Sequence, residues 1–191
     1  PMSSIDGRHK VIFNGEIYNY NEIRSELNNL GCKFNSSSDT EVLLNAYIYW
    51  GPECVEKFRG MFAFAIYDQV KKIIFLSRDR AGEKPLFYAV TDGDLFFGSE
   101  IKPLINYSEK LSSINKNSFS YLFQNGYTPK GESIFSEIFK LKAGHSLTFD
   151  LEKRNYLIKK YWQIAAAANK RFRYQNEDHL VKELQKRLEE S

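Results

Sequence analysis

The 191-residue sequence is poor in cysteine and proline, and it has no long apolar run. Its two cysteines, Cys32 and Cys54, show neither a secretory disulfide framework nor a metal-binding spacing, so we expect reduced thiols. No stretch approaches the length of a membrane span, and the first ten residues have no signal-peptide pattern. With only 5 prolines and 15% aromatic residues, the composition favours a β-rich core over disorder. We therefore expect a folded cytoplasmic protein.

Strong charge is also lacking. The formal net charge is +3, too small to indicate a nucleic acid or an anionic membrane as a partner. His9, His145 and His179 are isolated in the sequence, so we expect them at the surface and predict no metal site. The length and the 42% hydrophobic content suit one globular domain, or one domain with a piece of another. Both ends look cut, since the chain opens at Pro1 and a helix runs out at Ser191.

The sequence contains two segments with the pattern of a β-hairpin. Residues 61–68 alternate large and small side chains, residues 73–77 are almost continuously apolar, and a short polar turn joins them. Residues 86–90 and 95–98 flank the turn Asp92-Gly93. The small Ala63 and Ala65 predict close approach by another layer on one face. The pattern indicates a layered sheet with helices on it.

The remaining elements are predicted from local signals. Helices are expected over 20–30, with Asn19 as cap, and from Ser38 to Trp50, with Ser38 and Glu41 as a capping box. Short strands are expected at 32–34, 133–141 and 146–150, the last two joined by a turn at Ala143-Gly144, and a final segment at 156–162. The charged run 78–84 predicts a salt-bridged loop.

The stretch Val11–Asn19 carries the candidate site. Three apolar residues predict a buried strand that stops at Asn14-Gly15, after which a helix begins. The Asn14 side-chain amide and the Gly15 backbone N–H would then lie at an exposed strand end and point into the same space. Such a pair of donors can hold developing negative charge on an oxygen. The alternative is an ordinary loop in which glycine supplies backbone freedom.

Asp39 also has two interpretations. It lies in the first turn of the second predicted helix, where a carboxylate interacts favourably with the helix dipole. Its functional interpretation is to receive an ammonium group from a ligand.

Five motifs in order resemble a known family, the glutaminase domain of glutamine-hydrolysing asparagine synthetases. They are Asn-Gly-Glu-Ile-Tyr-Asn at 14–19, Ser-Asp-Thr-Glu at 38–41, Phe-Arg-Gly-Met-Phe-Ala-Phe-Ala-Ile-Tyr-Asp at 58–68, Arg-Asp-Arg-Ala-Gly-Glu-Lys-Pro-Leu-Phe-Tyr at 78–88 and Ser-Glu-Ile-Lys at 99–102. The resemblance covers 1–162. It predicts a linker over 163–177 and, over 178–191, the first helix of a truncated synthetase domain.

The resemblance implies a fold, a reaction and site residues. The fold is a truncated α+β N-terminal-nucleophile hydrolase, with two antiparallel sheets stacked between helix layers in the order αββα. The reaction is glutamine hydrolysis to ammonia for the ATP-dependent amidation of aspartate, with ATP and Mg²⁺ bound in the synthetase domain. Asn14 and Gly15 would form the oxyanion hole, and Asn14, Gly15, Glu16 and Asp39 would bind glutamine, with Asp39 at the α-ammonium. We allow for assembly as a homodimer.

The sequence departs from the family at both ends. The family's nucleophile is a cysteine at the mature N-terminus, and neither Cys32 nor Cys54 matches it; both are expected to be packing residues. An early arginine-rich segment and the Ser-Gly-Gly-x-Asp-Ser loop that binds ATP are also missing. We expect a partial sequence that hydrolyses no glutamine by itself.

Two alternatives remain open at this point. The acceptor could be another carboxylate, such as a sugar acid in surface-polysaccharide synthesis. The chain could also be a non-catalytic scaffold that keeps the fold.

Overall fold

The computed structural model describes residues 1–129, 131–164 and 177–189, except for the side chain of Arg187. All paired strands in this part of the chain are antiparallel. A six-stranded sheet has the order β1 (Met2–Ser3), β2 (His9–Ile17), β3 (Gly60–Asp68), β4 (Ile73–Arg78), β8 (His145–Asp150) and β9 (Asn155–Lys160). A three-stranded sheet has the order β6 (Asp94–Gly98), β5 (Phe87–Thr91) and β7 (Phe139–Lys140).

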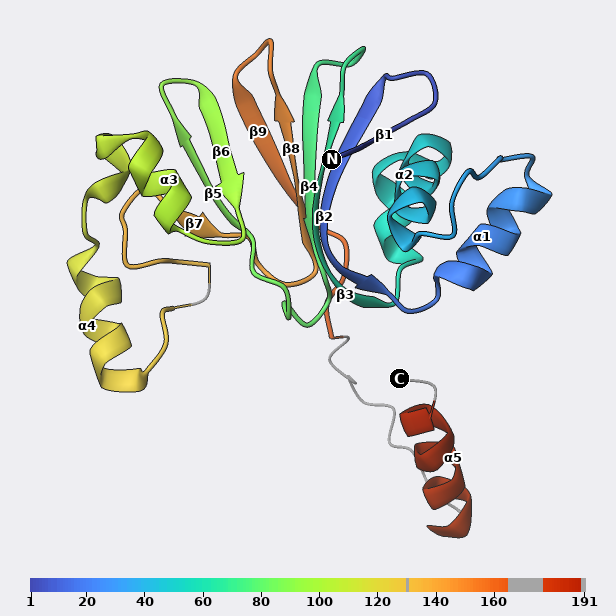
Figure 1. Ribbon diagram of the computed structural model, residues 1–191. Helices are drawn as coiled ribbons and strands as arrows, with labels where there is room; N and C mark the ends of the chain where they lie inside the picture. Colours follow the sequence, from blue (N-terminus) through green and yellow to red (C-terminus); the bar gives the residue numbers. More distant parts are fainter. Residues whose placement is uncertain (130, 165–176, 190–191) are drawn as a thin grey trace.

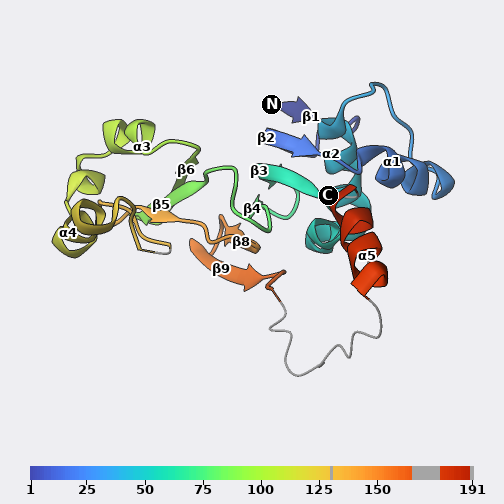
Figure 2. The ribbon, with the colours of Figure 1, turned by 90° about the horizontal axis from the view of Figure 1, so that it is seen from below.

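Helices lie outside the two sheets. Helices α1 (Tyr20–Asn29) and α2 (Asp39–Trp50), followed by the 3₁₀ helix η1 (Gly51–Glu56), lie on the side of the large sheet. Helix α3 (Lys102–Tyr107), the 3₁₀ helix η2 (Glu109–Ser112) and helix α4 (Lys116–Asn125) lie on the side of the small sheet. The views in Figures 1 and 2 agree on this order, helices, sheet, sheet, helices. The described residues therefore form the four αββα layers that the resemblance implies.

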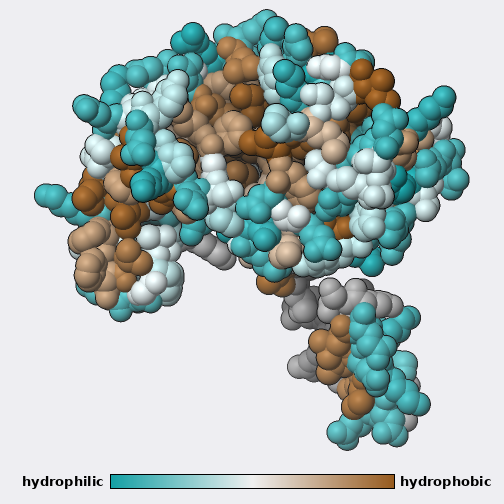
Figure 3. Space-filling view, viewed as in Figure 1, coloured by the Kyte–Doolittle hydropathy of each residue, from teal (hydrophilic) through white to brown (hydrophobic). Residues whose placement is uncertain are grey.

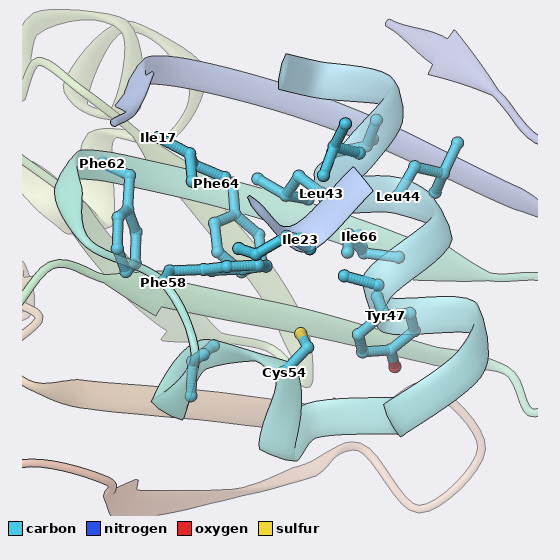
Figure 4. Packing of buried hydrophobic residues seen from close by; sticks show 14 of the residues in the cluster. Ile17, Ile23, Leu43, Leu44, Tyr47, Cys54, Phe58, Phe62, Phe64 and Ile66 are labelled. Carbon is cyan, nitrogen blue, oxygen red and sulfur yellow. The ribbon is translucent and has the colours of Figure 1, made fainter. Parts of the chain in front are cut away.

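Each interlayer space holds its own buried apolar cluster. Between α1, α2 and the large sheet, Phe62, Phe64 and Ile66 of β3 meet helix residues such as Leu43 and Tyr47, and Figure 4 shows this packing. The cluster also contains the buried Cys54 and the partly buried Cys32 at its margin, so the expected packing role of both cysteines is confirmed.

The opposite face of β3 carries small residues. Ala63 and Ala65 pack with Leu76 of β4 and with Leu86 and Tyr88 from the small-sheet side. A third cluster, centred on Ala89, Leu104 and Leu111, joins the small sheet to α3 and η2. The close approach predicted from Ala63 and Ala65 is thus confirmed, because these alanines lie where the two sheets face each other.

Both predicted hairpins are present, but two predicted strands are wrong. Residues 32–34 are not a strand, and over 133–141 only β7 is one. β7 pairs with β5 of the small sheet, whereas β8 pairs with β4 of the large sheet. Gly144, at φ +66°, lies where the chain crosses between sheets, and its N–H donates to the Asp79 carbonyl at 2.8 Å. A local turn signal does not show whether the next strand returns to the same sheet.

Two predicted caps also differ from the structure. Ser38 does cap α2 and accepts from the Thr40 N–H at 3.1 Å, but Glu41 binds the N–H groups of Asn35 and Ser36 rather than closing a capping box. Asn19 makes no side-chain cap for α1. Its amide instead bridges the Lys57 carbonyl and the Arg59 N–H, so it fastens the start of α1 to the loop before β3.

The charged run 78–84 is not a salt-bridged loop. Asp79 is fully buried and its carboxylate accepts from the N–H groups of Phe62, Gly82, Glu83 and Lys84. The Arg78 guanidinium donates to backbone carbonyls, including that of Leu141 at 2.7 Å, and burial lowers the pKa of Arg78. Both charges are therefore held by the main chain, which fixes the turn after β4.

His9 is buried, which corrects the surface position expected for it. Its Nε2 lies 3.4 Å from the Asp68 carboxylate. Arg8 binds the same carboxylate with two nitrogens at 2.9 and 2.8 Å, and the Val70 and Lys71 N–H groups donate to it at 3.0 Å. The Arg8 hydrogen bonds hold the pKa of Asp68 well below its usual value. This cluster closes the β3–β4 turn onto β2.

We expect Asp68→Asn to lower the free energy of unfolding by about 2 kcal/mol at pH 7, less than for a fully buried pair because Arg8 is one-third exposed. The folded pKa of Asp68 lies below its unfolded value of about 3.9. The stabilisation is therefore present above that pH and is lost as the pH falls further. Urea unfolding from pH 3 to 7 should show the two proteins converging in acid. A variant at the exposed Asp94 serves as control, and an unchanged difference at pH 3 would contradict this origin.

The predicted linker over 163–177 lies mostly outside the described residues. Helix α5 (Glu177–Glu189) covers most of the segment 178–191 that is predicted to be helical. Residues 190–191 lie outside the described residues. Among the described helices, none has the length and apolarity needed to cross a membrane.

Candidate active site at the edge of strand β2

Strand β2 does not stop at Asn14-Gly15, as expected from the sequence, but continues through both residues to Ile17. Asn14 pairs with Ala63 and Gly15 with Phe62 of β3. The candidate residues therefore lie along a strand rather than at its end. What matters is which way each polar group faces.

Gly15 forms a pair with Phe62 in which the two residues exchange no hydrogen bonds. The Phe62 N–H donates to the Asp79 carboxylate at 3.2 Å and its carbonyl accepts from the Asp79 N–H at 2.8 Å, so both polar groups of Phe62 face β4. In an antiparallel ladder, the polar groups of a residue opposite such a position face away from the partner strand. The Gly15 N–H is therefore directed to the other edge of β2.

That edge is only partly covered. β1 pairs with β2 opposite Lys10 and Val11 alone, so Gly15 lies beyond it in the described chain. Two residues further on, the Ile17 N–H faces the same edge and donates to the Asp39 carboxylate at 3.2 Å. Asp39 is the first residue of α2, so the N-terminus of this helix is attached to the β2 edge beside Gly15.

The side chain of Asn14 lies on the face of β2 that is turned to the small sheet, since it shares that face with its partner Ala63. It is exposed, and its Nδ2 donates to Ser99 Oγ at 3.2 Å. Asn14 and Ser99 are on the wall of a cavity of about 200 Å³ whose other lining residues are apolar or glycine. Figure 3 shows apolar residues around a hollow between the two sheets.

Two glycines shape the strand pair at this point. Gly15 has φ +142°, and a Cβ there would lie 2.0 Å from the Met61 carbonyl oxygen. Gly60 has φ +147°, and a Cβ there would lie 2.1 Å from the Glu16 carbonyl oxygen. Each glycine thus faces the backbone of the other strand at a distance that leaves no space for a side chain.

The structure brings all four predicted site residues to one corner, at the end of β2. Asn14 and Gly15 are neighbours on β2, and Asp39 reaches Ile17 of the same strand. Glu16 is exposed on the face that carries Asn14, and its carboxylate forms no ion pair within the described residues. Sequence reasoning missed the contact between Asn14 and Ser99. The only signal for Ser99 was its position at the start of the Ser-Glu-Ile-Lys motif.

Metal ligands do not gather at this corner. Over residues 1–129, 131–164 and 177–189, no group of three or more His, Cys, Asp or Glu side chains could hold a metal ion. The described residues therefore offer no ligand set for the Mg²⁺ that accompanies ATP.

A family model described as "Glutamine amidotransferase domain" matches residues 1–162. The chain belongs to this family. The amidotransferase domain resembles the asparagine synthetase [glutamine-hydrolyzing] 3 of Bacillus subtilis, with 39% identity over 158 residues, 82% of this chain and 25% of the relative. It also resembles a putative asparagine synthetase [glutamine-hydrolyzing] 2 of Methanocaldococcus jannaschii, with 40% identity over 156 residues, 81% of this chain and 30% of the relative.

A solved structure supports the fold. The glutamine phosphoribosylpyrophosphate amidotransferase of B. subtilis superposes with a TM-score of 0.56 at 18% identity, covering 85% of this chain and 31% of that one. The amidotransferase domain thus has an N-terminal-nucleophile hydrolase fold. It is homologous to the glutaminase domains of asparagine synthetases, and the chain spans about a quarter to a third of the length of these relatives.

Proposed function

We propose that this amidotransferase domain forms part of a glutaminase site in which the Asn14 side-chain amide and the Gly15 N–H are the oxyanion hole. A cysteine thiolate from outside the chain would attack the side-chain amide carbon of glutamine, and the carbonyl oxygen would become negatively charged. Two preorganised N–H donors would stabilise that charge without reorganisation. The observation that carries the proposal is the register of β2, which directs the Gly15 N–H away from β3 and towards the edge that receives Asp39.

The spacing of groups along that edge suits glutamine. The N–H groups of Gly15 and Ile17 are two residues apart, about 7 Å on a strand. Four bonds of about 1.5 Å separate the amide carbon of glutamine from its α-nitrogen, a reach of about 5 Å when extended. A glutamine with its carbonyl oxygen near Gly15 would therefore bring its ammonium group towards Asp39, whose carboxylate is attached at Ile17. Glu16 adds a second carboxylate next to this position.

The whole protein would use the ammonia to amidate aspartate, with ATP and Mg²⁺ bound by residues outside this chain. The relatives named as asparagine synthetases support that assignment. We place the reaction in the cytoplasm because asparagine synthesis uses cytoplasmic amino acids and ATP.

We expect the 191-residue chain alone to release no ammonia from glutamine, because neither cysteine lies at the β2 edge. Cys54 is buried in the cluster beneath α2, and burial raises the pKa of its thiol, so little reactive thiolate forms. The measurement is ammonia release by the purified chain at pH 7–8, with a Cys54→Ala variant as control. Activity that disappears with Cys54→Ala would contradict the proposal.

A direct assay distinguishes aspartate from other carboxylate acceptors. A full-length protein carrying this domain should form asparagine from aspartate and ammonia and leave uronic acids unchanged. Preferential amidation of a uronic acid would favour a role in surface-polysaccharide synthesis. Absence of amidation and of glutaminase activity in the full-length protein would favour a scaffold.

A further inference from the structure

We infer that Ser99 is a positioning residue that restrains the Asn14 side-chain amide so that its second N–H faces the reacting carbonyl. The inference rests on the proposed oxyanion role of Asn14 and adds to it a residue from the other sheet. It starts from the 3.2 Å hydrogen bond from Asn14 Nδ2 to Ser99 Oγ, which joins residues 85 positions apart.

An asparagine amide can stabilise an oxyanion in only one of its two main orientations. Its terminal torsion is broad and roughly two-fold, so an unheld carboxamide presents oxygen and nitrogen with similar ease. Nitrogen carries two N–H donors, whereas the amide oxygen only accepts and would repel an oxyanion. In this structure the Ser99 hydroxyl accepts from one N–H of the amide, which limits rotation of the amide and leaves the second N–H available to the substrate.

Ser99 is placed to make this contact by the small sheet. It follows Gly98, the last residue of β6, which pairs with Phe87 of β5. Asn14 belongs to β2 of the large sheet. Both residues line the same cavity, together with Gly98, Phe97 and Ala63. The contact therefore spans the two sheets at the wall of the candidate site.

Neither Asn14 nor Ser99 makes another side-chain hydrogen bond in the described residues that would explain this contact. Among the described residues, Ser99 Oγ is the single side-chain partner of the Asn14 amide, and Asn14 is the single side-chain partner of Ser99. The pair is too exposed to act as a buried polar contact that stabilises the core. Its geometric effect is on the orientation of the amide.

The test uses a full-length protein that carries this domain and hydrolyses glutamine. Ser99→Ala should lower kcat for glutamine about 3- to 10-fold, the loss of about one net hydrogen bond, with little change in KM. Ammonia-dependent synthesis should be unchanged. Ser99→Thr, which keeps the hydroxyl, should restore most of kcat. Ser120→Ala, at an exposed serine of α4, is the matched control and should have no effect.

A double variant distinguishes positioning from a separate structural effect. If Ser99 acts through Asn14, then adding Ser99→Ala to Asn14→Ala should cause no further loss of kcat. A further loss as large as in the wild-type background, or an unchanged kcat in the single Ser99→Ala variant, would overturn the inference while leaving the oxyanion assignment in place. An unchanged kcat in Asn14→Ala would overturn both.

Discussion

Replacing Asn14 with alanine in a full-length protein carrying this domain should lower kcat for glutamine hydrolysis by about 10²–10³-fold, the usual cost of one lost oxyanion donor. The Gly15 N–H remains, so residual activity is expected. KM for glutamine should change little, because the lost hydrogen bond strengthens only when the carbonyl oxygen becomes an oxyanion. Steady-state release of glutamate from glutamine measures both constants.

The same variant should retain ammonia-dependent synthesis, because added ammonia bypasses the glutaminase site. Asn106→Ala, at an exposed asparagine of α3, controls for the loss of a surface amide and should leave both reactions unchanged. Equal losses in the glutamine- and ammonia-dependent reactions would indicate misfolding or a remote effect and would count against the oxyanion assignment.

Gly60→Ala should strongly destabilise the fold. Its Cβ would lie 2.1 Å from the Glu16 carbonyl oxygen, and backbone cannot rotate away as a side chain can. Strain at φ +147° adds to this overlap. With about 1–3 kcal/mol from each source, we expect the free energy of unfolding to fall by about 2–6 kcal/mol. Urea unfolding of the chain measures it.

Gly31→Ala separates the two contributions. Gly31 also has positive φ, at +88°, but a Cβ there would meet nothing within 4 Å. In Gly31→Ala only the strain of a positive φ remains, so the free energy of unfolding should fall by about 1 kcal/mol. Similar losses for Gly31→Ala and Gly60→Ala would show that the β2–β3 contact is not the constraint. In the full-length protein, Gly60→Ala should also displace Gly15 and reduce glutaminase activity.

Local patterns predicted much of the layered fold. Alternation over 61–68 assigned the large residues of β3 to one layer and Ala63 and Ala65 to another, because side chains of a strand point to opposite faces with a period of two. Turn signals located both hairpins. Where these signals failed, at 133–141 and in the loop 78–84, the partner was a distant segment. For example, the Leu141 carbonyl accepts a hydrogen bond from Arg78, which lies 63 positions away in the sequence.

The sequence by itself determined the layers, the two hairpins and the family motifs, because these depend on residues close together in the chain. Only the tertiary structure decided how the candidate site is built. The direction of the Gly15 N–H depends on the register with β3, and a shift of one residue would turn that N–H into the sheet. The approach of Asp39 to Ile17 and of Ser99 to Asn14 depends on how a helix and a second sheet pack on β2, which no local pattern encodes.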